Sequence, residues 1–309
     1  MMVKKIEKAQ LRSEIGELES ILEDTPEQYA IGRFSLERRI DSLKESLAEL
    51  EGTPEIYAEA ALMFGGRPVL GCVGIEADFG TNALNDFQSV VDVMGSEHAH
   101  SGMGKRGPLK DKRSTQLHVT NTMRGSFGFE LREISDGTED MFQTELSKVV
   151  DKVMDIAVAA AEDEDEFDEA ISEIDSRTLK KFGAFFERIN KAEATVRMIV
   201  GEKEKDFSRA DIEVATARAT ATSLEEETQE ANVIFGGAFP DSHRFEIKKD
   251  SEIIKGPIDK EIPPSQLTQW NREFAGEECL VKWSVKKITR HNETKLKYRL
   301  LEISEIDED

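Results

Sequence analysis

The stretch that decides the fold is CLVKWSVKKITRHNETKLKYRLLEI, residues 279–303. Apolar and polar residues alternate on both sides of the central RHNET, residues 290–294. Because successive residues of a strand face opposite sides of a sheet, this pattern predicts two strands joined by a tight turn. One face of the predicted hairpin is apolar and carries Trp283 and Tyr298. The other face is basic, and its members are Lys282, Lys286, Lys295, Lys297 and Arg299.

Upstream of this hairpin the sequence predicts three further strands and one short helix. The strands are expected at 226–239, 243–249 and 252–256, and the helix at 263–276 with Ser265 as its N-cap. Three strands, a helix and two strands is the element order of an OB-like barrel, which residues 225–303 resemble in this order alone. An SH3-like barrel with an inserted helix fits the same order. The sequence therefore predicts a five-stranded OB-like or SH3-like barrel at 223–309.

The N-terminal segment 1–52 has the apolar spacing of two helices. Leucine and isoleucine recur at intervals of three and four residues, at Leu11, Ile15, Leu18, Leu22, Leu36, Ile40, Leu43, Leu47 and Leu50. This spacing is typical of the a/d seam of a coiled coil. Pro26 predicts a turn between the helices, although one long helix kinked at this proline is an alternative. A seam this narrow buries little, so we expect either the body of the protein or a second copy to cover it.

The central residues 53–222 combine both kinds of pattern. Residues with a preference for strands surround Gly65-Gly66 and occupy two runs within 115–135. Helical spacing of apolar residues marks 83–94, 142–160 and 179–196. The prediction for this part is an α+β body, in which long helices cover a small antiparallel sheet.

Charge and composition exclude some functions and weaken others. The chain has 63 acidic and 41 basic residues, so its net charge of −22 argues against general binding to nucleic acid or to an anionic membrane. No segment approaches the roughly 20 apolar residues of a membrane helix, and the N-terminus lacks the pattern of a signal peptide. Cys72 and Cys279 are expected to be reduced core residues. We therefore expect a cytoplasmic protein.

The segment 95–114, GSEHAHSGMGKRGPLKDKRS, is basic within this acidic chain. Its candidates for contact with an anion or an acidic partner are Lys105, Arg106, Lys110, Lys112 and Arg113. The alternative is a solvated linker whose charges offset the protein's own acid. His98 and His100 could bind a metal together if the backbone were extended, but no further ligand completes a set at a known spacing. We expect no metal and no cofactor.

Evidence for catalysis in the sequence is weak. His118 and Ser126 could lie on neighbouring strands as a base and a nucleophile. The glycines around Ser126 form Gly-Ser-Phe-Gly, which is not the nucleophile elbow and suits a tight turn. Neither a phosphate-binding loop nor a dinucleotide fingerprint is present. Whether the protein is an enzyme stays open, and the residues favour a protein that is not.

The leading hypothesis is a non-catalytic interaction or assembly protein. It would associate with a protein partner or with itself through the helical arm and the barrel. The alternative is a nucleic-acid-binding protein that uses the basic face of the 279–303 hairpin together with segment 95–114. A third hypothesis is an enzyme, such as a hydrolase, centred on His118 and Ser126 or on His98 and His100.

Overall fold

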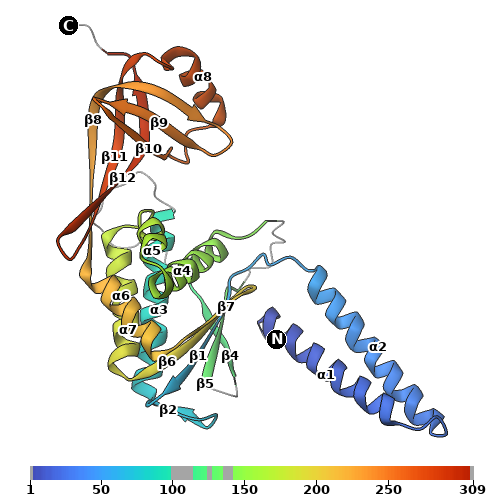
Figure 1. The fold of residues 1–309 in the computed structure, drawn as a ribbon. Coiled ribbons are helices and arrows are strands. Elements are labelled where there is room, and N and C mark those ends of the chain that lie inside the picture. The colour runs from blue at the N-terminus through green and yellow to red at the C-terminus, as the bar shows by residue number, and fades with distance from the viewer. Residues whose placement is uncertain (1–2, 99–113, 124–126, 135–141, 307–309) are drawn as a thin grey trace. The chain divides into compact units, whose positions relative to one another are not determined.

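A computed structural model describes residues 3–98, 114–123, 127–134 and 142–306. These residues mix helices with antiparallel sheets, as the sequence predicts (Figure 1). The chain divides into two compact units: Met1–Ala170 with Lys180–Ala219, and Ile171–Leu179 with Thr220–Asp309. No helix in the described part of the chain has an apolar stretch long enough to span a lipid bilayer.

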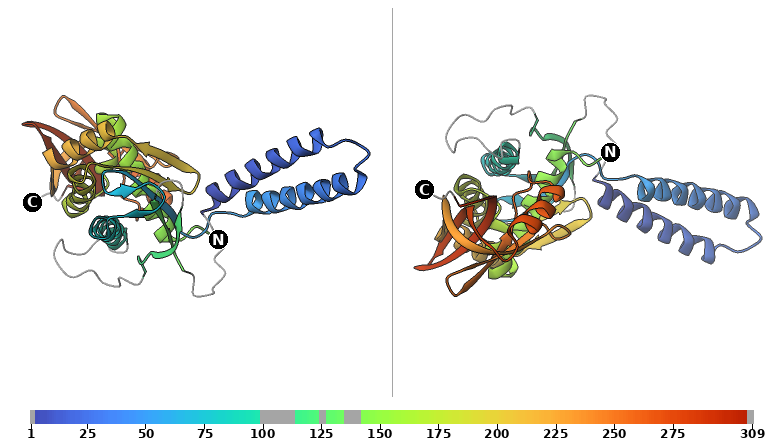
Figure 2. Two further views of the ribbon diagram at one scale, coloured as in Figure 1. Left: turned by 90° about the horizontal axis from the view of Figure 1, so that it is seen from below. Right: turned by 90° about the horizontal axis from the view of Figure 1, so that it is seen from above.

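The first unit begins with two helices, α1 (Lys4–Asp24) and α2 (Ala30–Gly52). They run side by side in opposite directions, which all the views of the ribbon show (Figures 1 and 2). The chain thus turns back after Thr25 and does not form one kinked helix. Arg33 holds the turn closed, because its Nη1 donates hydrogen bonds to the carbonyls of Leu22 and Thr25.

The apolar seam lies between these two helices. Ile15, Ile40 and Leu43 are buried there. The partly buried residues packed around these three are Leu11, Leu18, Leu22 and Leu47. Leu36 and Leu50 are half-buried. The arm therefore covers part of its seam by pairing its own helices.

Ion pairs between α1 and α2 add to the apolar seam. The pairs are Arg12 with Glu51 at 2.6 Å, Arg39 with Glu14 at 2.8 Å and Lys44 with Glu19 at 2.7 Å. Both arginines lie in the first half of their helix and Lys44 lies just past the middle of α2, whereas Glu19 and Glu51 lie in the second half and Glu14 near the middle of α1. Neither helix has a basic residue in its last turn. This distribution opposes the helix dipole, so the charges favour the antiparallel pair over either helix alone.

The body of the first unit is a five-stranded antiparallel sheet in the order β4-β5-β1-β6-β7. Its strands are β1 (Glu59–Gly66), β4 (His118–Met123), β5 (Phe127–Arg132), β6 (Ala194–Val200) and β7 (Lys203–Phe207). Two short strands, β2 (Val69–Leu70) and β3 (Gly74–Ile75), form a separate ribbon. Cys72 lies in the turn of this ribbon and is exposed, so its predicted place in the core is wrong.

Helices cover one face of this sheet (Figure 1). They are α3 (Ala77–His98), α4 (Glu145–Glu162), α5 (Glu164–Ile171), α6 (Ser176–Lys191) and α7 (Arg209–Ala221). Aromatic rings fill the space between helices and strands: Phe64 of β1 meets Phe79 of α3 edge to face, and Phe186 of α6 meets Phe207 of β7 in the same way. The long helices over a small sheet follow the prediction.

Strands β6 and β7 were not predicted. The expected helix 179–196 ends at Lys191 instead, and Glu193 turns the chain with a φ of 53°. Val196 falls at a helical spacing from Ile189, but it belongs to ATVRMIV, whose β-branched residues suit a strand. The prediction therefore merged one helix with the strand after it.

The base of the arm packs on the other face of the sheet. Val3 is buried against Ala61, Met123 and Ile199. Just beyond it, Lys5 donates to the carbonyl of Glu202 at 2.8 Å, and Lys8 pairs with the Glu202 carboxylate at 2.6 Å. The start of α1 is thus fixed to the strands, whereas the partners described for its distal end lie in α2 and in the turn between the two helices.

The second unit is a curled, five-stranded antiparallel half-barrel with one helix (Figure 1). Its elements are β8 (Thr222–Phe239), β9 (Arg244–Lys249), β10 (Glu252–Pro257), α8 (Pro264–Phe274), β11 (Glu278–Arg290) and β12 (Glu293–Ser304). Three strands, a helix and two strands is the predicted order. The predicted cap is wrong, because Pro263 occupies the N-cap of α8 and no side chain caps the helix.

The sheet order β10-β9-β8-β11-β12 curls until its two edge strands meet. Ile258 and Leu300 form a single parallel bridge there. Gly256 permits the approach, since a Cβ at this position would lie 2.2 Å from the carbonyl oxygen of Tyr298. The curled sheet encloses one core, made of Val233, Phe235, Ala238, Phe245, Ile247, Ile254, Ile258, Ile262, Leu267, Trp270, Cys279, Val281, Trp283, Val285, Leu300 and Ile303.

Candidate binding pocket in the half-barrel

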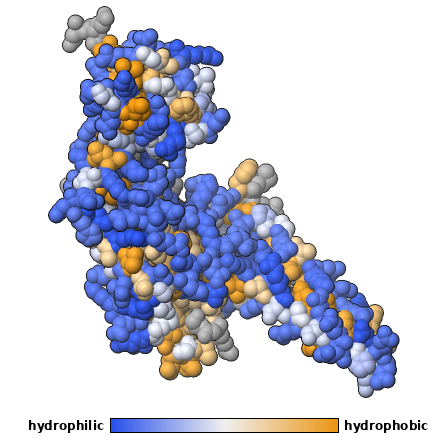
Figure 3. Space-filling model, viewed as in Figure 1, coloured by the Kyte–Doolittle hydropathy of each residue, from blue (hydrophilic) through white to orange (hydrophobic). Residues whose placement is uncertain are grey.

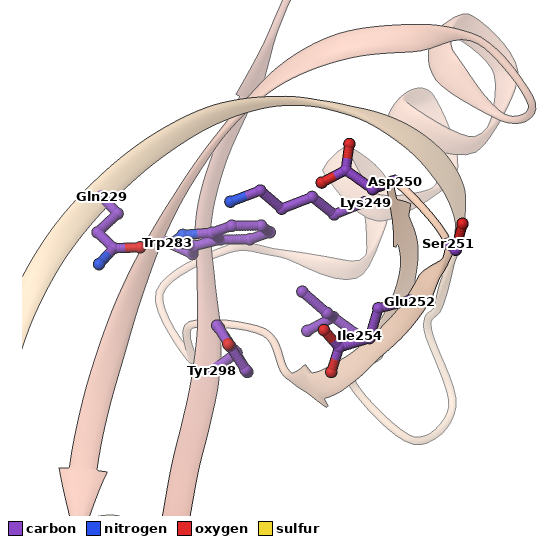
Figure 4. A pocket seen from close by; sticks show the side chains of 8 residues that line it. All are labelled: Gln229, Lys249, Asp250, Ser251, Glu252, Ile254, Trp283 and Tyr298. Carbon is purple, nitrogen blue, oxygen red and sulfur yellow. The ribbon is translucent and has the colours of Figure 1, made fainter.

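A pocket of about 550 Å³ opens in the second unit (Figure 4). Its lining residues are Gln229, Lys249, Asp250, Ser251, Glu252, Ile254, Trp283 and Tyr298. They come from all five strands and from the tight turn between β9 and β10. The curl of the sheet therefore brings together residues that are up to 69 positions apart between Gln229 and Tyr298.

Two aromatic rings form the floor of the pocket. Trp283 is only 1% exposed, and Tyr298 packs edge to face against it with ring centroids 5.6 Å apart. The register of β11 against β12 shifts between Lys282 and Trp283. Such bulges re-aim side chains in a sheet. The bulge thus lies at Trp283, whose ring forms part of the pocket floor.

The indole of Trp283 is a donor without an acceptor. Its Nε1 is buried, and within the described part of the chain no acceptor receives its hydrogen. Gln229 stands opposite Trp283 in the β8–β11 register and on the Nε1 side of the ring, but its own amide donates to Glu227. An unsatisfied buried donor costs about 1–3 kcal/mol. A bound group with an oxygen acceptor would remove that cost.

The face of the Trp283 ring is occupied by a cation from the protein itself. The Nζ of Lys249 lies 5.7 Å from the ring centroid, and Figure 4 shows the lysine side chain extended across the ring. A cation in this position is attracted by the electrons of the ring face. Lys249 ends β9, directly before the turn at Asp250, whose φ is 54°. The turn thus places the lysine over the ring.

The rim of the pocket is acidic. Asp250 and Glu252 are exposed, and neither carboxylate takes part in a hydrogen bond or ion pair within the described residues. The pKa of Tyr298 is raised, first by its burial and then by the negative charge of Glu252. The surroundings of the pocket therefore disfavour a further negative charge.

The predicted basic face of the hairpin is largely neutralised on β11. Lys286 is 8% exposed, and its Nζ donates to the carbonyls of Ser172 and Ile174 at 2.7 and 2.9 Å. Lys282 faces Glu230 at 3.6 Å. The ammonium groups of both lysines therefore already have partners within the second unit.

The acidic neighbour of β11 is the stretch EEETQE on β8, residues 225–230. In the β8–β11 register this stretch lies beside the lysines, and Lys287 also pairs with Glu227, at 2.9 Å. On β12, Lys295 is exposed, whereas Lys297 and Arg299 are half-buried. These three remain as candidate anion contacts.

None of the other candidate residues that the structure describes lines this pocket. His118 is exposed on β4, opposite Arg132 of β5. His98 is the last residue of α3, and its side chain lies outside the described part. The remaining candidates lie outside the described residues altogether: His100, Lys105, Arg106, Lys110, Lys112, Arg113 and Ser126. The described residues contain no group of three or more His, Cys, Asp or Glu that could hold a metal ion.

Sequence reasoning placed Trp283 and Tyr298 in the core and did not identify the pocket. The missing information was the position of the β9–β10 turn, which brings Lys249, Asp250 and Glu252 next to the rings. A usable signal was the aromatic pair itself, because Trp283 and Tyr298 fall on the same face of a predicted hairpin.

No family model matches the chain, and no curated protein and no solved structure matches it. The chemistry of the pocket must therefore be inferred from its own residues. The pocket provides an aromatic surface, an unused donor and an acidic rim, which are the elements of a binding site.

Proposed function

We propose that this protein is a non-catalytic interaction protein whose half-barrel binds a partner protein. The observation that carries the proposal is the buried indole Nε1–H of Trp283, a residue that lines the pocket, which has no acceptor among the residues that the structure describes. A donor that is buried and unused in the free protein is explained when a ligand supplies the acceptor. A peptide carbonyl is such an acceptor.

The edge of the sheet supports a peptide as the partner group. The far end of β10 is closed by β12, where Gly256 packs on Tyr298 and Ile258 bridges Leu300. In the described ladders the stretch Glu252–Ile254, which borders the pocket, pairs only with β9, so its second edge carries no ladder there. An extended segment can add to such an edge through its backbone and place a side chain in a neighbouring pocket. The OB-like assignment belongs to this proposal, since OB folds are partly open five-stranded barrels that bind ligands at this kind of surface.

The two tryptophans of the chain allow a direct test. Trp283 lines the pocket, whereas Trp270 is buried in α8 and serves as an internal control. We would record the two indole N–H signals by NMR while adding acetylated five-residue peptides with a central acidic, neutral or basic residue. The Trp270→Phe variant assigns the signals.

We expect at least one class of peptide to shift the Trp283 signal in a saturable way, while the Trp270 signal stays in place. If none of the peptides moves the Trp283 signal, the half-barrel does not bind peptides through this pocket and the proposal is wrong. Equal movement of both signals would indicate a general change of the unit and would also contradict it.

A second candidate function is self-association through the arm. Ile31 is 88% and Phe34 60% exposed near the tip of the helical hairpin. Figure 3 shows apolar patches along α1 and α2 between hydrophilic ones. The distal half of α1 is acidic and the facing half of α2 is basic. Two arms in a twofold arrangement would therefore set opposite charges against each other.

Light scattering coupled to size exclusion tests this arm. We expect full-length protein to form dimers that Ile31→Ser combined with Phe34→Ser converts to monomers. Deleting the arm is a poorer test, because Val3 covers part of the sheet. A monomeric wild-type protein at tens of micromolar would remove self-association from the proposal.

The nucleic-acid alternative has less support from the residues. The lysines of β11 face the acids of β8, and the pocket rim is acidic. Stacking of bases on Trp283 would first require Lys249 to leave the ring. The two free thiols fit the expected reducing compartment, the cytoplasm.

A further inference from the structure

We infer that the half-barrel pocket recognises an arginine side chain of the partner, and that Lys249 occupies the arginine position in the free protein. The inference rests on the proposed function and deepens it by naming the group that is bound. Three independent features of the pocket carry it: the cation over Trp283, two carboxylates without a partner among the described residues, and an indole N–H without an acceptor among them.

The first feature shows what the ring face accepts. Lys249 holds an ammonium 5.7 Å from the Trp283 centroid although Asp250 and Glu252 are close by in the same pocket. A guanidinium is planar, is less strongly hydrated than an ammonium and stacks on aromatic rings. An arginine is thus a better occupant of the same face than the lysine it would replace.

The second feature is the acidic rim. The carboxylates of Asp250 and Glu252 have no hydrogen-bond or ion-pair partner in the described part of the chain. A guanidinium carries five donors in a fixed plane, which can reach a carboxylate and stack on a ring at the same time. The protein's net charge of −22 attracts a basic segment and repels an acidic one.

The third feature separates a peptide from a small free cation. The Nε1–H of Trp283 needs an acceptor, which a guanidinium lacks. The backbone carbonyl of a bound segment provides one beside the arginine. The pocket volume of about 550 Å³ is large enough for a side chain together with part of the backbone that carries it.

Binding therefore begins with an exchange of cations. The incoming guanidinium takes the ring face and the rim carboxylates, and the Lys249 ammonium moves into solvent, where it is well hydrated. Lys249 acts as an internal competitor of the ligand, so its removal strengthens binding. This is the opposite of what an anion-binding lysine would do.

The experiment compares two peptides that differ only in charge. The probes are acetyl-Gly-Ala-Arg-Ala-Gly-amide and the same peptide with citrulline, the neutral isostere of arginine, in its place. The readout is the saturable shift of the Trp283 indole N–H, with Trp270 as the reference. We expect the arginine peptide to bind at least about tenfold more tightly than the citrulline peptide, as the loss of a charged partner implies.

The decisive variant is Lys249→Met, and its matched control is Lys248→Met. Both variants remove one positive charge from β9, but Lys248 is the neighbouring residue and is exposed. We expect Lys249→Met to tighten binding of the arginine peptide about two- to fivefold, the size of a partly exposed cation–π contact. Lys248→Met is expected to change the affinity for the arginine peptide by less than about half of the change caused by Lys249→Met.

The outcomes distinguish this inference from the proposed function. Binding of acidic or neutral peptides without preference for arginine, or weaker binding by Lys249→Met, overturns the arginine assignment and leaves the peptide-binding function in place. Absence of any shift at Trp283 with all peptides overturns both. A single-stranded oligonucleotide that shifts Trp283 more strongly than the arginine peptide would overturn the choice of partner.

Discussion

The helical arm and the half-barrel are stabilised in different ways. The arm buries three side chains between its helices and adds ion pairs at its surface. The half-barrel encloses a core of 16 buried residues. Surface ion pairs contribute little, whereas buried apolar area is the main source of stability. We therefore expect the arm to open locally while the half-barrel stays folded, which suits an arm that exchanges contacts and a pocket that keeps its shape.

The largest expected effect lies in the half-barrel core. Phe235→Ala removes a fully buried ring from β8 and is expected to lower the free energy of unfolding of this unit by about 3–5 kcal/mol. Urea unfolding followed by tryptophan fluorescence reports this unit, because both tryptophans lie in it. The control is Phe239→Ala on the same strand, where the ring is 51% exposed and a change within about 0.5 kcal/mol is expected. Equal losses for the two variants would contradict the description of the core.

The thiols offer a second comparison. Burial raises the pKa of the Cys279 thiol to about 11, with a smaller contribution from Glu278. At pH 8 its thiolate population is about 100-fold below that of a thiol at the ordinary value of 9.0. We expect a disulfide reagent to label Cys72 rapidly and Cys279 only when the half-barrel opens.

The Cys72→Ser variant is expected to lose only the rapid phase of labelling. The same pKa shift affects stability, because the unfolded thiol ionises before the folded one. The contribution of the Cys279 thiol to the free energy of unfolding is complete below pH 9.0 and is lost as the pH rises towards about 11. Two equally rapid phases would show that Cys279 is accessible.

The third expected effect lies in the arm. Ile40→Ala removes one of the three buried seam residues, and we expect a loss of about 2 kcal/mol that is confined to the arm. Hydrogen exchange would show faster exchange in α1 and α2, with unchanged protection in β8 and β11. Ile21→Ala, at an exposed position of α1, is the control. Loss of protection throughout the chain would mean that the arm and the body unfold together.

The smallest expected effect comes from the ion pairs of the arm. A double-mutant cycle with Arg39→Ala and Glu14→Ala is expected to give a coupling of at most about 1 kcal/mol, and less at high salt. The measurement is the exchange rate of the α1 amides. A coupling as large as the effect of Ile40→Ala would show that charge, and not the seam, holds the helices together.

The sequence was informative where a pattern is local. The alternation around Trp283 and Tyr298 predicted two strands, and the three-four spacing of leucines predicted two helices; the structure contains these elements. The pattern failed at Val196, where a strand follows a helix without a proline and its apolar residues continue the helical spacing. Propensity alone does not resolve such a junction.

The pocket depends on contacts between distant strands. Lys249 and Trp283 are 34 positions apart, and the curl of the sheet decides that one covers the other. The sequence likewise identified Lys282 and Lys286 as basic. It did not show that Lys282 would pair with Glu230, or that Lys286 would donate to the carbonyls of Ser172 and Ile174. The side chains were visible in the sequence, and their partners were not.

The reversed charge order of the two arm helices has a consequence during protein synthesis. Alone, α1 carries Lys4 and Lys5 beside Glu7 in its first turn and only acids in its last, and each terminal charge that opposes the helix dipole costs about 0.3–1 kcal/mol at low salt. The isolated α1 segment is therefore expected to have low helical stability while it leaves the ribosome. It gains its structure once α2 has emerged as well, so the nascent hairpin folds as one cooperative step.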